Sequence, residues 1–116
     1  MNRNALFIIT GDPRTSPRPA EAVRIAAGVG AWKKIDVTVY LRGQTVLSLN
    51  EFTDELVDAD NYARYWPIIG GWGRPIQVQQ GNPWLAGVEN PGLTWREISD
   101  AELAALAAGS DYVLRF

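Results

Sequence analysis

The sequence predicts an α/β fold, a three-layer sandwich in which helices cover both faces of a mostly parallel sheet of about five strands. Short runs rich in β-branched residues alternate along the chain with segments of helical periodicity, which is the pattern of a parallel sheet. The 116 residues suit one core, so we expect a single domain over residues 1–116. A composition of 47% hydrophobic and 21% charged residues is typical of a globular protein.

The N-terminal part of the chain predicts a strand followed by a helix. Ala5–Thr10 is short, apolar and rich in isoleucine, as expected of a buried strand. A helix is expected to begin at Pro17 or Pro19, with Ser16 as its cap. It ends near Trp32, and small residues such as Gly30 would let it lie close to the sheet.

The middle of the chain predicts a second strand and a second helix. Ile35–Leu41 is β-branched and nearly alternating, which favours a strand, and Thr45–Leu49 continues as a short apolar segment. Glu51–Asp60 is acidic and predicts a loop with a helical turn. The apolar residues within Tyr62–Ile69 recur at helical spacing, although Pro67 should interrupt or kink that helix.

The C-terminal part predicts three more elements after the second helix. Pro75–Gln79 and Thr94–Ile98 are the third and fourth strands, separated by a turn-rich segment. Ser99 and Glu102 have the spacing of a capping box, and Gly109 is a suitable stop for the helix that follows. The chain ends in DYVLRF, the fifth strand.

The absence of two residue types restricts the chemistry that this chain can perform. The sequence contains 0 Cys and 0 His, which excludes thiolate nucleophiles, imidazole acid–base catalysis and the usual zinc ligands. We therefore predict no catalytic residue, no metal site and no cofactor. The net charge of -2 provides no electrostatic reason to bind nucleic acid or an anionic membrane.

The location expected from the sequence is the cytoplasm. The apolar stretches are far shorter than a membrane span, and the opening MNRNALFIIT lacks a secretory pattern.

The loop after the first strand is a candidate ligand-binding site. Its glycine, hydroxyls, guanidinium groups and the following helix start have the chemistry of an anion receptor. The residues concerned are Gly11, Asp12, Arg14, Thr15, Ser16 and Arg18. The loop matches neither the P-loop nor the G-x-G-x-x-G pattern, and the alternative is a solvated connection stiffened by prolines.

Polar residues after the second and third strands extend this candidate site. Arg42 would add a basic group near the first loop, or would only form an exit turn. Gln79, Gln80 and Asn82 would hydrogen-bond a ligand, or would cap strand ends. The acidic residues between positions 51 and 60 have no spacing that pairs two carboxylates beside a nucleophile, so we interpret them as a solvated surface.

The aromatic residues predict a subunit interface. Five Trp are many for a chain of this length, and large aromatics are enriched at the centres of interfaces. Tyr62, Tyr65, Trp66 and Trp72 are the candidates, with Trp66 or Trp72 at the contact. The alternative is that these side chains fold back and close the edges of the core. We expect a homo-oligomer, a trimer or hexamer before a dimer.

Three stretches resemble a known family: ALFIITGDPRTSPRPAEAVRIAAG, IDVTVYLRGQTVLSL and the terminal SDYVLRF. They are similar to the DsrE/DsrF-like family, which includes the subunits of the TusBCD sulfur relay. The resemblance covers nearly the whole chain but includes no diagnostic motif. It implies a compact α/β sandwich of flavodoxin-like topology that assembles into trimers or hexamers. Active members of the family pass sulfane sulfur on a cysteine just after the third strand.

This chain departs from the family at that cysteine. The position falls in IQVQQGNP, nearest Gln79 or Gln80, and an amide has no thiolate with which to form a persulfide. The first hypothesis is therefore a non-catalytic subunit that associates with itself or with a cysteine-bearing DsrE-like partner. The second is a small-ligand or anion-binding module that uses Gly11–Arg18 and the loop after Gln79. The third, an enzyme acting through carboxylates or hydroxyls, has the least support.

Overall fold

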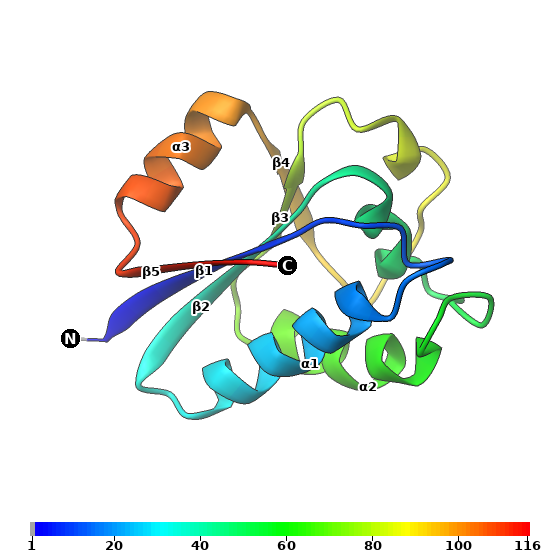
Figure 1. Ribbon diagram of the computed structural model, residues 1–116, viewed down its shortest axis with the longest axis horizontal. Coiled ribbons are helices and arrows are strands. Elements are labelled where there is room, and N and C mark those ends of the chain that lie inside the picture. The colour runs from blue at the N-terminus through cyan, green and yellow to red at the C-terminus, as the bar shows by residue number, and fades with distance from the viewer. Residues whose placement is uncertain (1) are drawn as a thin grey trace.

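The computed structural model describes residues 2–116, in which five strands form one sheet flanked by three α-helices (Figure 1). The elements in chain order are β1 (Arg3–Ile9), α1 (Arg18–Ala31), β2 (Ile35–Leu41), the 3₁₀ helix η1 (Gly43–Leu49), α2 (Ala59–Gly70), β3 (Ile76–Gln79), the 3₁₀ helix η2 (Pro83–Leu85), β4 (Trp95–Ile98), α3 (Asp100–Ala108) and β5 (Tyr112–Arg115). Within residues 2–116 no helix has the length and apolar character needed to cross a membrane.

All neighbouring strands of the sheet are parallel, in the order β4-β3-β2-β1-β5. Helices α1 and α2 lie side by side on one face, and α3 lies on the other (Figure 1). After β4 the chain crosses the sheet through α3, so that β5 lies beside β1 at the opposite edge. The predicted fold class, an α/β sandwich with a parallel sheet of about five strands, is confirmed.

The two faces of the sheet contribute unequally to the core. Alternate residues of β1, such as Ala5 and Phe7, point to the α1 and α2 side and join a large buried cluster. The other side has a small cluster of Leu6, Tyr40 and Ile98, against which α3 packs only half-buried side chains. The α3 layer is thin because none of its nine residues is fully buried.

Local signals located the ends of α3 accurately. Ser99 Oγ accepts a hydrogen bond from the Glu102 N–H at 3.1 Å, and the Glu102 carboxylate accepts one from the Ser99 N–H at 3.1 Å. Gly109 follows the helix as expected. At α1 the predicted cap is wrong by one residue, because Pro17 occupies the cap position. Ser16 Oγ still accepts a hydrogen bond from the Arg18 N–H at 3.2 Å.

The structure adds detail to the middle of the chain. The apolar segment Thr45–Leu49 is part of η1. Helix α2 continues through Pro67, so the expected interruption of this helix is wrong, and the alternative of a kink stays a prediction. Pro67 lacks the N–H that would bond to the carbonyl four residues earlier, but burial of neighbouring side chains of α2 holds the helix together. Gly30 accommodates the ring of Trp72, which a Cβ at this position would overlap, and this packing against Trp72 rather than against the sheet explains the glycine.

Candidate functional site

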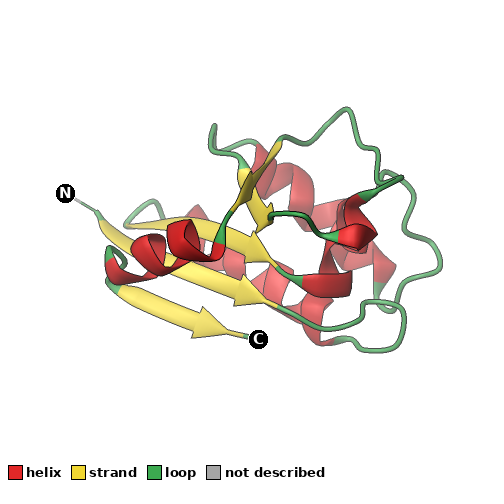
Figure 2. Cartoon of the chain, turned by 90° about the horizontal axis from the view of Figure 1, so that it is seen from above, coloured by secondary structure: helices red, strands yellow, loops and turns green. Residues whose placement is uncertain are grey.

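The polar residues predicted from the sequence lie where the parallel strands end. Strands that run in the same direction bring their carboxyl ends to one edge of the sheet, where α/β proteins usually bind ligands (Figure 2). The structure brings Gln79 and Asn82 together beside Gly43, directly after β2. Gln80 is exposed at the same edge, and its N–H donates to the Ile98 carbonyl at 3.0 Å.

Gln79 and Asn82 are bonded to the chain itself. Gln79 Oε1 accepts hydrogen bonds from the Gly43 N–H at 3.0 Å and from Asn82 Nδ2 at 3.3 Å. Asn82 Nδ2 also donates to the Gly43 carbonyl at 3.0 Å, and its Oδ1 accepts from the Trp84 N–H at 2.8 Å. Asn82 is only 6% exposed. We call this set the carboxyl-edge network, and its geometry corresponds to the capping alternative, because it ties the loops after β2 and β3 together.

Arg42 does not join the first loop. Its guanidinium Nη1 donates to the Asp100 carboxylate at 3.0 Å and to the Tyr40 hydroxyl at 3.1 Å. The hydrogen bond to Asp100 is the main reason why the pKa of Arg42 lies above its ordinary value. Because Asp100 begins α3, this contact ties the end of β2 to the opposite face of the sheet from α1.

The first loop neutralises much of its own charge. Asp12 accepts hydrogen bonds from Arg14 Nε and Nη2, both at 2.9 Å, and these bonds hold the pKa of Asp12 below its ordinary value. The guanidinium carbon of Arg14 also lies 5.0 Å from the centre of the Trp84 ring. Arg14 therefore has an internal counter-ion where the anion-receptor hypothesis needs an unpaired cation.

The remaining residues of this loop also make internal contacts, except for the exposed side chain of Arg18, which forms no ion pair within residues 2–116. The Gly11 carbonyl accepts a hydrogen bond from Thr45 Oγ1 at 2.7 Å, and Thr15 Oγ1 lies 3.5 Å from the Asp12 carbonyl oxygen. Ser16 is engaged by the Arg18 N–H. Gly11 has a φ of +110°, which favours glycine and sharpens the turn after β1. These internal bonds favour the alternative of a structural connection between β1 and α1 over that of an open anion receptor.

Two of the four aromatics predicted at a subunit interface lie inside the chain. Tyr62 and Trp66 are each 2% exposed and belong to the large core, so they offer no surface to a second subunit. Tyr65 is half-buried, and Trp72 packs on Gly30 with Arg74 5.9 Å from its ring. For Tyr62 and Trp66 the interface expectation is corrected, because α2 turns this side toward the sheet.

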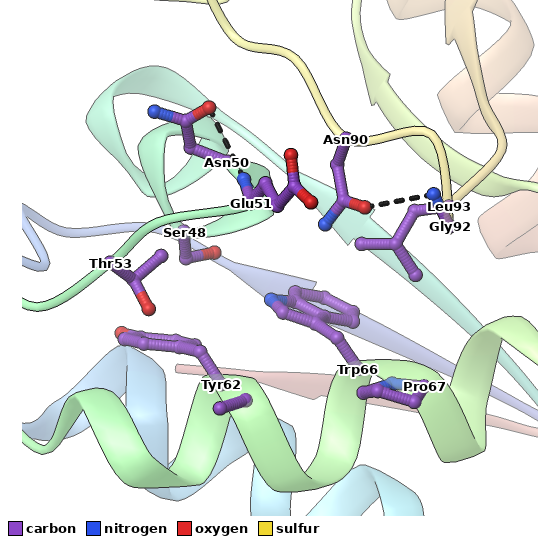
Figure 3. A pocket seen from close by; sticks show the side chains of 11 residues that line it. Ser48, Asn50, Glu51, Thr53, Tyr62, Trp66, Pro67, Asn90, Gly92 and Leu93 are labelled. Atoms are coloured by element: carbon purple, nitrogen blue, oxygen red, sulfur yellow. Dashed lines mark hydrogen bonds between the residues drawn. The ribbon is translucent and has the colours of Figure 1, made fainter.

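These buried aromatics border a cavity of about 280 Å³ that the sequence did not reveal, here called the α2 pocket. Its walls come from α2, from the end of η1 and the chain that follows it, and from the segment before β4 (Figure 3). The polar lining side chains are Ser48, Asn50, Glu51, Thr53, Tyr62, Trp66 and Asn90. The apolar wall includes Pro67 and Leu93.

Two donors in the α2 pocket lack partners. Neither the Tyr62 hydroxyl nor Trp66 Nε1 makes a hydrogen bond within residues 2–116, and each atom exposes less than 1 Å². Burial, reinforced by the negative charge of Asp58, raises the pKa of Tyr62, so the phenol keeps its proton at physiological pH. Buried polar atoms without partners are uncommon and cost free energy, which makes this pair the most informative polar feature of the structure.

The rim of the α2 pocket is held by backbone contacts of two asparagines. Asn90 Nδ2 donates to the Leu49 carbonyl at 3.0 Å, and Asn90 Oδ1 accepts from the Gly92 N–H at 2.9 Å. Asn50 Oδ1 accepts from the N–H groups of Glu51 and Glu89 at 3.2 and 3.1 Å. These bonds join two segments far apart in the sequence, so no local pattern could have predicted the pocket. The only sequence signal was the i, i+4 spacing of Tyr62 and Trp66.

Comparison with known proteins supports the fold and little beyond it. No family model matches this chain, and no curated protein sequence matches it. Among solved structures, the crystal structure of the YchN protein from E. coli superposes with a TM-score of 0.78 at 17% identity, over 100% of both chains. The chain has a DsrE-like fold. At this identity the likeness shows the fold alone, and the DsrE-like fold agrees with the family resemblance seen in the sequence.

Proposed function

We propose that this chain is a non-catalytic DsrE/DsrF-like subunit that acts by association, with a second copy of itself or with a cysteine-bearing DsrE-like partner. The observation that carries the proposal is the exposed apolar edge of the sheet at β5. The same edge can receive either partner, and self-association is the form that the experiment below tests first.

Strand β5 has a neighbour on one side only. It pairs with β1 from Ala5↔Tyr112 to Ile8↔Arg115, and its other side ends the sheet (Figure 2). An unpaired strand edge is a template for another chain, and no proline or helix of the described chain protects this one.

An apolar groove accompanies this edge on the α1 face. It is lined by seven apolar or aromatic residues and one carboxylate: Ala5, Phe7, Val29, Ile35, Asp111, Tyr112, Val113 and Leu114. Tyr112 remains 45% exposed, and Trp32, three residues after Val29 at the end of α1, is 75% exposed. Large apolar side chains along an open strand favour a protein partner, since aromatic residues dominate the energetics of interfaces.

The absence of relay chemistry follows from the side chains at the position of the family's cysteine. Gln79 is part of the carboxyl-edge network, and Gln80 is an exposed amide. Neither can accept sulfane sulfur. The purified chain should gain no sulfur mass when incubated with a persulfidated carrier protein, and a covalent sulfur adduct in intact mass spectrometry would contradict the non-catalytic assignment.

The oligomeric state tests the association. Light scattering coupled to size exclusion should give the mass of a trimer or hexamer, and Tyr112→Lys should reduce this mass, to that of the monomer for a trimer, because a further charge then enters the groove. Phe52→Lys is the matched control, since Phe52 is 78% exposed but lies away from the groove. A monomeric parent chain, or dissociation by Phe52→Lys alone, would contradict the proposed interface.

Anion binding by the loop Gly11–Arg18 is the alternative function, and the pairing of Asp12 with Arg14 weighs against it. Under this alternative sulfate would raise the melting temperature, and Arg18→Ala would abolish the rise. We expect no response to sulfate.

A further inference from the structure

We propose that the α2 pocket binds a small uncharged polyhydroxyl compound, a monosaccharide or polyol, which meets the unpartnered Tyr62 and Trp66 with its hydroxyl groups. This site is separate from the β5 edge and does not depend on the association proposed above.

The first argument is that the two buried donors need hydrogen-bond partners. An indole N–H only donates, so Trp66 needs an acceptor atom, and the protonated Tyr62 phenol can donate or accept. Both atoms lack a partner within residues 2–116 and belong to side chains that are 2% exposed and line the same cavity, although each atom itself exposes less than 1 Å². Figure 3 shows both rings between α2 and the chain after η1, with the Tyr62 hydroxyl near Thr53 and the indole nitrogen turned toward the Ser48 side.

The second argument is that an acceptor at the mouth of the pocket needs a hydrogen-bond donor. The Glu51 carboxylate only accepts, and within the described chain it forms neither an ion pair nor a side-chain hydrogen bond. The Thr53 hydroxyl also has no hydrogen-bond partner there. A ligand must therefore offer acceptors to the inner donors and a donor to Glu51. Hydroxyl groups meet both demands because each one donates and accepts.

The third argument is charge and size. No lysine or arginine lines the α2 pocket, and Glu51 at its mouth disfavours an anion. A cation would pair with Glu51 but would leave the Trp66 N–H without an acceptor. The cavity of about 280 Å³ is just below the usual range of about 300–1,000 Å³ for ligand pockets. A single-ring sugar or short polyol fits these limits, with Pro67 and Leu93 against its C–H groups.

Entry of the ligand requires movement of two side chains. Tyr62 and Trp66 carry their polar atoms below the solvent-accessible surface, so a ligand reaches them only when neighbouring lining side chains move. The candidates are Thr53, drawn beside the Tyr62 hydroxyl in Figure 3, and Glu51. Both lie in the irregular segment between η1 and α2, and Glu51 is exposed. Because neither side chain is hydrogen-bonded within residues 2–116, displacing them breaks no side-chain bond of the described chain.

The test is an NMR titration of the indole N–H signals with D-glucose, D-ribose, glycerol and myo-inositol at millimolar concentrations. The protein has five Trp, and the signal lost in Trp66→Phe identifies Trp66. We expect at least one of the four compounds to shift the Trp66 signal saturably. Tyr62→Phe should weaken this binding about tenfold, the equivalent of about 1.4 kcal/mol.

Tyr65→Phe is the matched control, because it removes a hydroxyl from the same helix outside the pocket and should leave the affinity unchanged. The Tyr112→Lys variant should also bind normally, whatever its oligomeric state, which separates this site from the proposed interface. An unshifted Trp66 signal with all four compounds would overturn the proposal, and so would full affinity in Tyr62→Phe. A saturable response to acetate or methylammonium in place of the polyols would overturn the assigned ligand class.

Discussion

The carboxyl-edge network and the α2 pocket are both polar and largely buried, but they differ in whether their polar atoms have partners. In the network, Gln79 and Asn82 bond to each other and to the backbone at Gly43 and Trp84. In the pocket, the Tyr62 hydroxyl and Trp66 Nε1 bond to nothing in residues 2–116. The usual ligand edge of an α/β sheet is therefore bonded internally here, whereas the less expected pocket leaves two buried donors without partners in the described chain.

The physical reason for the difference is the geometry of the connections. Asn82 follows β3 by three residues and Gly43 follows β2 by two, so adjacent strands place the amide directly beside the backbone groups that it satisfies. The chain between η1 and α2 is longer and irregular, and it enters the helix through Asp58 in the left-handed region at φ 54°. Such a segment covers the aromatic rings of α2 without placing a hydrogen-bonding group opposite the Tyr62 hydroxyl or Trp66 Nε1.

The largest effect is expected from breaking the network. Asn82→Ala should lower the free energy of unfolding by about 1–2 kcal/mol, because it leaves the part-buried Gly43 carbonyl and Trp84 N–H without these partners. Urea denaturation measures this loss. Gln80→Ala, at an exposed neighbouring position, should change stability by less than about 0.5 kcal/mol. Equal effects of the two variants would contradict the structural role of the network.

A change of opposite sign is expected in the pocket. Tyr62→Phe should raise the free energy of unfolding of the ligand-free protein by about 1 kcal/mol, because it removes a buried hydroxyl that has no hydrogen bond. The same denaturation experiment, with Tyr65→Phe as its control, measures the gain. A clear loss of stability in Tyr62→Phe would mean that the hydroxyl is satisfied in solution, and the contrast between the two regions would then disappear.

The smallest effect concerns the first loop and depends on pH. The hydrogen bond from Arg14 lowers the pKa of Asp12, so the ionised carboxylate stabilises the folded state above the ordinary value near 4. This contribution is lost as the pH falls through the lowered pKa. Asp12→Asn should therefore make the acid loss of stability shallower, and added salt should reduce the difference because the pair is partly exposed.

Denaturation curves between about pH 5 and pH 2 measure this slope. Asp54→Asn is the control, since Asp54 is exposed and belongs to no ion pair of the described chain. An unchanged acid slope in Asp12→Asn would show that Arg14 is not held by Asp12, and Arg14 would then be available to an anion together with the exposed Arg18.

Much of the fold could be predicted because its signals are local. Alternating β-branched residues identified β2, and the Ser99–Glu102 spacing located the start of α3 within one turn. The sequence contains 0 Cys, so the exclusion of thiol chemistry required no structure. These properties depend on one residue or on residues a few positions apart, which is the range over which a sequence pattern carries physical information.

The tertiary structure alone decided the partners of the predicted site residues. Arg14 appeared to be an available cation until its pairing with Asp12 and its contact with Trp84 were known, and Arg42 proved to face Asp100. The spacing of Tyr62 and Trp66 predicts that both lie on one face of a helix. The spacing does not show whether that face packs on the core or contacts another subunit. Their burial depends on one segment that precedes β3 in the sequence and another that follows it. These two segments come together only when the sheet has assembled.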